Sequence, residues 1–308
     1  MTDEERDMAP PPFHHRSVLL AETLEALEPR AGRVYADATL GAGGHAEAIL
    51  DRCAPDGRLV GLDRDASALE AARARLSRFG ERVTLVHAPF AELRDVLRGV
   101  GVPRVHGLVA DLGVSSPQLD QPARGFSFRS EGPLDMRMDP SRGETASELC
   151  ARISERELAD LIFDLGEERK SRPIARSIKK AIDAGELATT EDLRRAVVRA
   201  IGPQRRGGID PATRTFQALR LAVNDELGQL DALLAQLGDV LEDDGVAVII
   251  SFHSLEDRRV KHHFRGSDLL SPLTKRPVVA GEDEQRENPR SRSAKLRAAR
   301  RLPRSEAA

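Results

Sequence analysis

The chain has 308 residues, of which 40% are hydrophobic and 31% charged. This balance is typical of a folded soluble protein, and the length predicts one large domain with an insertion, or two domains. The formal net charge of -3 excludes a uniformly basic nucleic-acid-binding protein. The two cysteines, Cys53 and Cys150, form neither a disulfide framework nor a zinc site, which indicates a reducing compartment. With no visible signal peptide and no apolar stretch that could span a bilayer, we expect a cytoplasmic protein without membrane contact.

Charge is distributed unevenly along the chain. Residues 285–304 hold eight Arg or Lys against one Glu, whereas residues 1–12 are acidic and rich in proline. We expect a disordered tail at 1–12. The C-terminal segment indicates a basic contact surface for nucleic acid on an otherwise acidic body.

The first half of the chain alternates between strand and helix patterns. A helix within residues 16–28 places Leu20, Leu24 and Leu27 on one face. Strands separated by helical segments of about ten residues predict right-handed crossovers and a parallel sheet. The predicted strands cover 34–38, 58–63, 83–88 and 106–112, and the predicted helices cover 43–52, 67–79 and 90–98.

The alternation stops after the fourth strand. Residues 113–144 favour ordered loops, and residues 145–201 favour helices, with Thr189 and Asp192 as a capping box. After a loop, Asp210 is the expected N-cap of one long helix through Leu241, and residues 245–252 form a fifth, buried strand. We therefore expect an all-helical domain at 141–210, inserted into an α/β domain that comprises 13–140 and 211–308.

A glycine-rich turn follows the first predicted strand, in the segment Asp37–His45 (DATLGAGGH). Gly41, Gly43 and Gly44 allow positive φ and the close approach of a ligand, and the next helix directs its amides at that ligand. Asp63 ends the second strand, where an acid suits ribose hydroxyls. A turn without any ligand is the less favoured structural interpretation.

The identity of that ligand stays open on the turn alone. The pattern G-x-G-x-x-A from Gly41 to Ala46 also fits a nicotinamide dinucleotide, so an oxidoreductase is an alternative. Two observations favour S-adenosylmethionine: Asp37 suits a cationic cofactor, and no second mononucleotide-binding half is visible. Phe90 could stack on adenine, or be an ordinary core residue, and Asp111 could lie beside the methyl group, or simply form a turn.

Several further segments are unusual. They are HRSVLL at 15–20, DLGVSSPQLDQPARGFSFRSEGPLDMRMD at 111–139, GEER at 166–169, DPATRTFQALRLAVN at 210–224, ISFHSLEDR at 250–258 and NPRSRSAKLR at 288–297. Together with the glycine turn, they closely resemble the MraW methyltransferases, the family of the ribosomal RNA small subunit methyltransferases H. The resemblance runs from about residue 14 to about residue 300. Two departures are Arg16 and Asp210, both outside the cofactor motif.

The resemblance implies a class I S-adenosylmethionine-dependent methyltransferase fold with an inserted helical substrate-recognition domain. It implies methylation of the N4 amine of a cytidine in the decoding region of 16S rRNA, within the small ribosomal subunit; a homodimer stays open. The residues that match the family's cofactor contacts are Gly43, Gly44, His45, Asp63, Phe90, Asp111 and Gln118, to which the turn adds Asp37 and Gly41.

The segment after the fourth predicted strand, together with His253, supplies the candidates for residues that act on the amine. Ser115-Ser116-Pro117-Gln118 stands where many DNA amino-methyltransferases have a Pro-Pro-aromatic motif, which argues against a DNA substrate. Our candidates are Asp111, Ser115, Ser116 and His253, although His253 could equally be structural. We expect no metal, because Arg137 can satisfy Asp135 and Asp139.

The candidate phosphate contacts are arginines and one lysine, any one of which could also be an ordinary surface residue. They are Arg124, Arg214, Arg258, Arg290, Arg292 and Lys295. A non-catalytic RNA-binding or assembly factor with the same fold is a third hypothesis.

Overall fold

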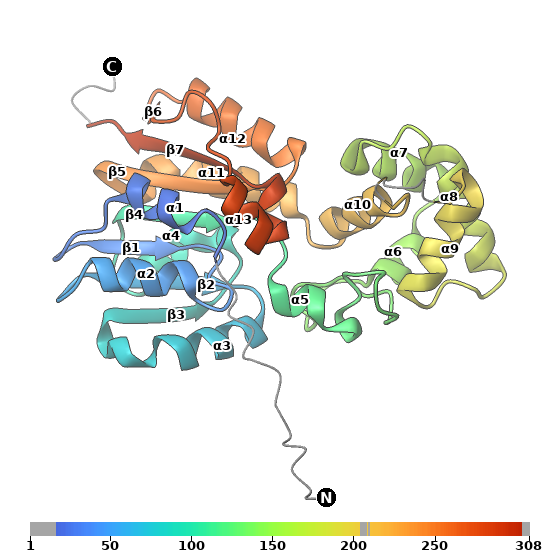
Figure 1. The fold of residues 1–308 in the computed structure, drawn as a ribbon, viewed down its shortest axis with the longest axis horizontal. Helices are drawn as coiled ribbons and strands as arrows, with labels where there is room; N and C mark the ends of the chain where they lie inside the picture. The colour runs from blue at the N-terminus through green and yellow to red at the C-terminus, as the bar shows by residue number, and fades with distance from the viewer. Residues whose placement is uncertain (1–16, 204–207, 209, 304–308) are drawn as a thin grey trace, which may run out of the picture.

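The computed structural model describes residues 17–203, 208 and 210–303, so the tail predicted at 1–12 lies outside the described residues. The molecule has two lobes, an α/β lobe built on one sheet and an all-helical lobe beside it (Figure 1). The chain passes from the first lobe to the second after β4 and returns before β5.

The α/β lobe contains a seven-stranded sheet in the order β3-β2-β1-β4-β5-β7-β6. Strands β1 to β5 are parallel, and β7 is antiparallel to both β5 and β6. The predicted α/β class with a mostly parallel sheet is confirmed. The strands are β1 (Val34–Asp37), β2 (Arg58–Asp63), β3 (Val83–His87), β4 (Val105–Asp111), β5 (Leu241–Ser251), β6 (Leu270–Pro272) and β7 (Lys295–Arg301).

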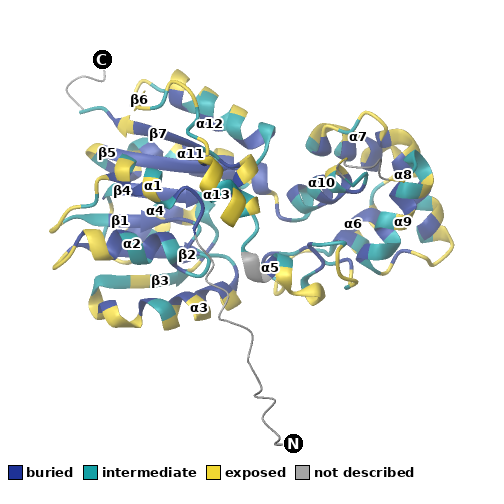
Figure 2. Ribbon diagram, viewed as in Figure 1, coloured by how far each residue is buried: buried dark blue, intermediate teal, exposed yellow. Residues whose placement is uncertain are grey.

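Helices cover both faces of the sheet because alternate strand residues point to opposite sides. In β5, Val248 and Ile250 pack toward one face, while Ala247 and Ile249 pack toward the other. Helices α1 (Leu20–Leu27), α2 (Gly44–Arg52) and α3 (Ala66–Leu76) cover the first face, and α4 (Leu93–Gly99), α11 (Glu226–Val240) and α12 (Ser254–Gly266) cover the second. The central strands β1, β4 and β5 are accordingly among the most buried parts of the lobe, whereas the edge strand β3 is only half-buried (Figure 2).

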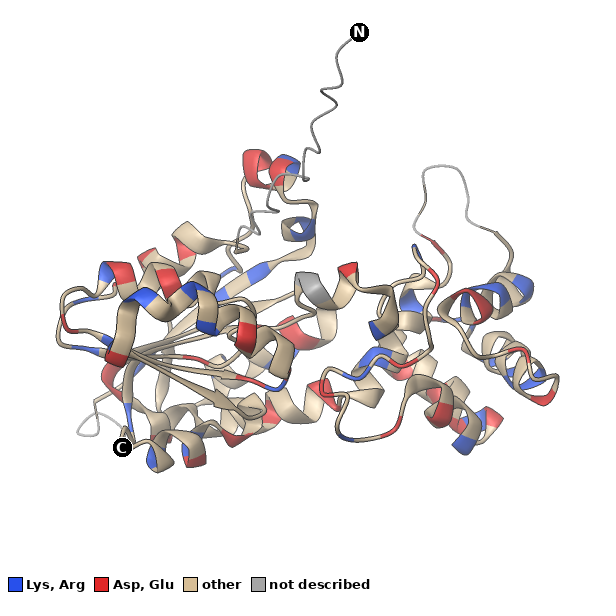
Figure 3. Ribbon diagram, turned by 90° about the horizontal axis from the view of Figure 1, so that it is seen from below, with Lys and Arg blue, Asp and Glu red and all other residues tan. Residues whose placement is uncertain are grey.

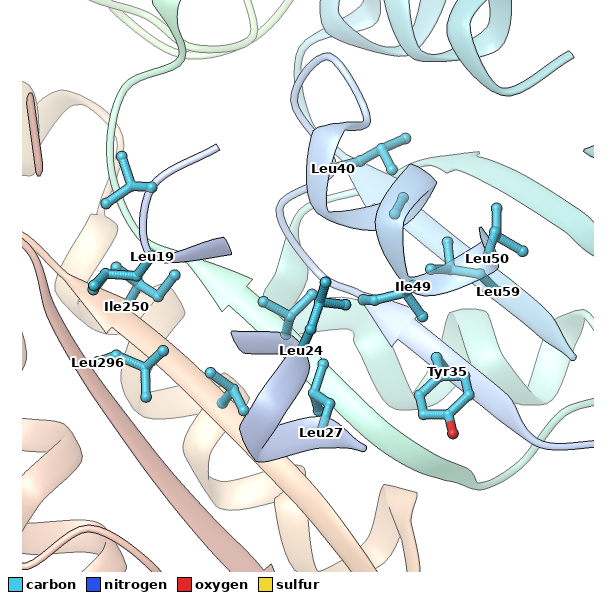
Figure 4. Packing of buried hydrophobic residues seen from close by; sticks show 14 of the residues in the cluster. Leu19, Leu24, Leu27, Tyr35, Leu40, Ile49, Leu50, Leu59, Ile250 and Leu296 are labelled. Carbon is cyan, nitrogen blue, oxygen red and sulfur yellow. The ribbon is translucent and has the colours of Figure 1, made fainter. Parts of the chain in front are cut away.

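The first face shows how the sequence pattern becomes packing. Leu24 and Leu27 of α1 lie with Tyr35 and Ile49 in one cluster (Figure 4). Both leucines are less than 9% exposed, and burial of a leucine side chain stabilises the fold by roughly 1.5–3 kcal/mol. The predicted helical face at Leu20, Leu24 and Leu27 is therefore correct for the last two, whereas Leu20 is only half-buried.

The helical lobe consists of α6 (Ala146–Arg152), α7 (Glu155–Gly166), α8 (Ser171–Asp183), α9 (Thr190–Ile201) and α10 (Thr213–Val223). Capping boxes begin α6, α7 and α9, and the predicted pair Thr189 and Asp192 is confirmed. The buried residues of the hydrophobic cluster in this lobe extend along the sequence from Phe126 to Leu219. We propose that the inserted unit extends beyond 141–210 in both directions.

One long helix from Asp210 to Leu241 was the wrong expectation, because the chain forms α10 and α11 with a break at Asn224 and Asp225. Asp225 adopts the left-handed conformation with φ of 47°, which Asp tolerates better than most residues. The Asn224 side chain donates to the carbonyl of Met136 at 2.7 Å and accepts from the amide of Met138 at 2.8 Å. These bonds tie the break to the loop that precedes the helical lobe.

The basic C-terminal segment is folded, and part of it belongs to the sheet. It forms a short helix α13 (Glu282–Glu287), a 3₁₀ turn and then β7, which lies inside the sheet between β5 and β6. Arg297 is 6% exposed and donates to Asp257 at 2.6 Å, and Arg301 is paired with Asp243. Part of the basic charge is therefore committed to the fold.

No helix in the described part of the chain is both long enough and apolar enough to cross a membrane.

Candidate active site

A cavity of about 520 Å³ opens at the carboxyl ends of the parallel strands. This is the edge at which open α/β sheets bind their ligands. The predicted cofactor and catalytic residues that line the cavity are Gly41, Gly44, His45, Asp63, Phe90, Asp111, Ser115 and Gln118, and Arg290 of the predicted phosphate contacts lines it as well. Three others, Asp37, Gly43 and His253, lie nearby but outside its lining.

The glycine turn has the geometry that its sequence predicts. Gly41 adopts φ of 51°, in the left-handed region that glycine enters without strain. Gly44 begins α2, and a Cβ there would lie 2.1 Å from Oγ of Ser17. The segment before α1 thus closes onto the turn, and Nε2 of His45 lies 3.0 Å from the carbonyl of Val18.

Asp63 joins the turn after β1 to the turn after β2. Its Oδ2 accepts from the amide of Gly41 at 2.7 Å, and its Oδ1 accepts from the amide of Asp65 at 2.8 Å. Burial raises the pKa of Asp63 to about 6 despite these bonds. The carboxylate is held rigidly at the position where an acid would contact a ribose.

Asp37 is almost fully buried at the end of β1. Its Oδ1 accepts from the amide of Thr39 at 3.1 Å, while Oδ2 has no hydrogen-bond partner within the described residues. Burial raises the pKa of Asp37 to about 8, and repulsion from Asp111 and Asp63 adds to the effect. A cation close by would stabilise this carboxylate.

Asp111 ends β4, on the wall of the cavity. Its amide donates to Oγ1 of Thr39 at 2.6 Å, and its Oδ2 lies 4.0 Å from Nδ1 of His45. Oδ1 is buried and without a hydrogen-bond partner in the described structure. Burial raises the pKa of Asp111 to about 7, and the nearby charge of Glu256 contributes.

The segment after β4 forms a short helix α5 (Ser116–Asp120) beside the cavity. Gln118 is buried, and its side-chain amide donates to Oδ2 of Asp65 at 2.9 Å while its carbonyl accepts from the amide of Ser115 at 3.0 Å. The Ser115 hydroxyl is buried without a partner among the residues described. The side chain of Ser116 lies outside the described part of the structure.

His253 is the N-cap of α12 and does not reach the cavity, whereas Glu256 does. Oε2 of Glu256 accepts from the amide of Phe252 at 2.9 Å, and its Oε1 lies 3.1 Å from Nε2 of His253. The structural interpretation of His253 fits this placement. The HSLED motif contains Glu256 at a capping-box spacing, a signal that could have identified it.

Sequence reasoning also missed a buried ion pair on the cavity wall. Nε and Nη2 of Arg220 donate to Glu226 at 2.7 and 2.9 Å. Attraction to Glu226 and Glu256 outweighs burial and raises the pKa of Arg220. The pair joins α10 to the start of α11, across the helix break, so no periodic pattern could have predicted it.

A sequence model of the MraW methylase family matches residues 12–302. The chain belongs to the MraW methylase family. The predicted resemblance is therefore confirmed over nearly the whole chain.

Curated relatives agree with this family. Ribosomal RNA small subunit methyltransferase H of Sorangium cellulosum (strain So ce56) is 61% identical over 302 residues, which cover 97% of this chain and 95% of that protein. The protein of the same name from Synechococcus sp. (strain CC9605) is 54% identical over 297 residues, with 95% and 99% covered. That from Geotalea uraniireducens (strain Rf4) is 47% identical over 312 residues, with 94% and 99% covered.

The residues of this MraW family member fit S-adenosylmethionine. Oδ2 of Asp37 is buried without a partner in the described structure, which suits the positive charge of this cofactor. Phe90 and Leu230 form an apolar part of the cavity wall, which is compatible with the predicted stacking of Phe90 on adenine. A dinucleotide pyrophosphate would instead face three acids, Asp37, Asp63 and Asp111, so family and charge both oppose the nicotinamide alternative.

The predicted phosphate contacts of the family member divide into two groups. Arg124 is nearly buried and donates to Asp65 at 2.8 Å and to the carbonyls of Arg137 and Met138, so it does not fit a phosphate contact. The other five are more exposed than Arg124. Four of them lie in ion pairs, namely Arg214 with Glu168, Arg258 with Glu167, Arg290 with Asp120 and Lys295 with Asp257, and the fifth, Arg292, is exposed. Lys and Arg alternate with Asp and Glu over both lobes (Figure 3).

Proposed function

We propose that this chain transfers a methyl group from S-adenosylmethionine to the N4 amine of a cytidine in the decoding region of 16S rRNA, within the small ribosomal subunit. Methylation of small-subunit rRNA with this cofactor follows from membership of the family. The finer assignment is supported by one observation above the others: the carboxylate side chain of Asp111, a quarter exposed, lies on the wall of the cavity beside the glycine turn.

The reaction places two demands on the site. The N4 lone pair is conjugated into the cytosine ring, so the amine is a weak nucleophile and loses a proton as it is methylated. The chemistry that the bound cofactor supplies is an electrophilic methyl group. Positioning can lower such a barrier by roughly 7–11 kcal/mol, whereas a general base contributes about 10²–10⁴-fold. The residues of the chain must therefore position the amine and also accept its proton.

Asp111 is our candidate acceptor for the amine hydrogen. Its backbone is held at the end of β4, its carboxylate lies on the cavity wall, and its pKa of about 7 suits proton transfer near neutral pH. Glu256 lines the same cavity from the end of the neighbouring strand β5 and keeps that pKa raised. Ser115 is a second acceptor, through its buried hydroxyl.

The exposed cations are proposed phosphate contacts. Arg214 and Arg258 both lie beside Glu167, Arg214 on its carbonyl and Arg258 on its carboxylate, where the two lobes meet. Arg290 lies at the cavity and pairs with Asp120 at 3.1 Å. With cations both at the junction of the lobes and at the cavity, we propose that RNA contacts the helical lobe as well as the α/β lobe. Cytoplasmic action and a homodimer stay predictions.

The test is direct methylation. Purified protein is incubated with labelled S-adenosylmethionine and small subunits from a strain that lacks the homologous enzyme, and the rRNA is digested and analysed by mass spectrometry. We expect N4-methylcytidine in a single decoding-region fragment. Label in another nucleoside, or transfer only to DNA, would overturn the assignment. Binding without any transfer would favour the assembly-factor hypothesis.

A further inference from the structure

Asp65 is a buried carboxylate that neither lines the cavity nor belongs to any predicted set of site residues. Its side chain is 3% exposed, and it lies two residues after Asp63, whose Oδ1 accepts from its amide. Buried charges are retained only where partners compensate them. The partners of Asp65 therefore indicate its role.

One oxygen of Asp65 serves a local purpose. Oδ1 accepts from the amide of Ser67 at 3.0 Å and from the Ser67 hydroxyl at 2.6 Å, which caps α3. Asn or Ser would cap this helix almost equally well. The cap alone does not require a charge.

The other oxygen reaches across the fold. Oδ2 accepts from Nε2 of Gln118 at 2.9 Å and from Nη1 of Arg124 at 2.8 Å. Burial would raise the pKa of Asp65, but the bonds from Ser67, Gln118 and Arg124 outweigh it and hold that pKa below its usual range. A carboxylate is required because both oxygens accept hydrogen bonds, whereas Asn has a single acceptor oxygen and its amide nitrogen would face the donors on the other side.

Each of these two donors holds a further segment. The carbonyl of Gln118 accepts from the amide of Ser115 at 3.0 Å, and so fixes the turn that carries the Ser115 hydroxyl. Nη2 of Arg124 donates to the carbonyls of Arg137 and Met138 at 3.1 and 2.9 Å. Met138 lines the cavity, and its amide donates to the side chain of Asn224, at the break between α10 and α11.

We propose that Asp65 is a positioning residue, which connects the ribose side of the cofactor site to the Ser115–Gln118 turn and the 137–138 loop on the acceptor side. This inference rests on the methyl transfer proposed above. Asp65 fixes the wall against which the target base is placed, and acts only through Gln118 and Arg124. A displacement of about 1 Å at a reacting group can cost about 10²-fold in rate, so the loss of this connection lowers the rate of transfer.

Asp65→Ser separates the two roles, because the Ser hydroxyl can keep the cap of α3 but supplies no second oxygen to Gln118 and Arg124. We expect kcat to fall at least about tenfold, while the Kd of S-adenosylhomocysteine changes less than about threefold. Ser67→Ala is the matched control, since it removes a hydrogen bond from the cap side of the same carboxylate. It should leave kcat within about twofold.

Hydrogen–deuterium exchange supplies a readout that does not depend on the substrate. In Asp65→Ser, exchange should accelerate in 113–124 and 136–138 and stay unchanged in α3. Equal acceleration throughout, or a fall in cofactor affinity that matches the fall in kcat, would overturn the positioning role. If the wild-type protein methylates no rRNA, the proposed function fails, and the exchange pattern still decides whether Asp65 holds these two segments.

Discussion

Oδ2 of Asp63 accepts a hydrogen bond of 2.7 Å from the amide of Gly41, so the acid after β2 and the glycine turn after β1 form one wall of the cavity. The bond crosses two adjacent parallel strands, because β1 pairs with β2 in register at Asp37 and Gly61. It orients the carboxylate that we expect to contact the cofactor ribose.

Asp63→Asn should weaken cofactor binding. A hydrogen bond to a charged group contributes about 1.5–3 kcal/mol, so the Kd of S-adenosylhomocysteine should rise about 10- to 100-fold. Isothermal titration calorimetry measures this directly. Asp51→Asn, the same substitution at an exposed acid on α2, is the control and should bind as the wild type does. Equal affinities for both variants would remove Asp63 from the site.

Asp111→Asn should lower the rate of transfer by about 10²–10⁴-fold, because the amide cannot take the amine proton. In the wild type, kcat/KM should rise with pH through about 7, since the carboxylate accepts the proton only when ionised. The variant should lack this limb of the profile. A pH–rate series on small subunits checks both statements; a variant that keeps the limb would show that another group titrates.

Asp37→Asn should make the fold more stable than the wild type, and the difference in stability should increase as the pH rises. The pKa of Asp37 is about 8 in the folded protein and near 3.8 when unfolded, so between these values the folded state binds the extra proton. Stability of the wild type therefore falls with pH through this window, by up to about 1.4 kcal/mol per unit. The variant loses this dependence.

The comparison needs only thermal unfolding. We expect the Tm advantage of Asp37→Asn over the wild type to grow from pH 5 to pH 8, while its cofactor affinity is lower. Asp183→Asn, at an exposed acid of α8, should show no such trend. A constant Tm difference over this range would contradict burial of a protonated Asp37.

Removal of residues 295–308 should prevent folding rather than simply weaken RNA binding. The deletion takes away β7, leaves β5 and β6 without their shared neighbour, and strips Asp257 of Arg297. Soluble yield and circular dichroism check this. A truncated chain with the wild-type Tm would contradict the role of β7 in the sheet.

Arg292→Ala is therefore the sharper test of RNA contact in this segment, because Arg292 is exposed. We expect an unchanged Tm, weaker binding to small-subunit rRNA, and a salt slope smaller by about 0.7–0.9 log units for one lost phosphate contact. An unchanged slope would remove Arg292 from the interface.

Local patterns were enough for much of the fold. The alternation of strands and helices predicted the parallel sheet, and the capping box at Thr189 predicted the start of α9. The glycine turn and the strand-end acids Asp63 and Asp111 predicted the edge at which the cavity opens. These features depend on nearest neighbours and on periodicity, which a sequence displays directly.

Long-range contacts decided the rest. The helical pattern continued past Asn224, and only the bonds from its side chain to Met136 and Met138 explain the break. The basic character of residues 285–304 suggested a surface, whereas β7 buries Arg297 against Asp257. Likewise, Arg124 carries a charge suited to phosphate, but Asp65, 59 residues earlier, occupies it.

The sequence by itself determined the α/β class, the family and the edge of the sheet that binds the ligand, because each is written in contiguous motifs. Only the tertiary structure decided which charged groups are available for chemistry. A largely buried charge is committed to the fold once an opposite charge lies within hydrogen-bonding distance. For Arg124, Arg297 and Arg220 that partner is set by packing between elements and not by spacing along the chain.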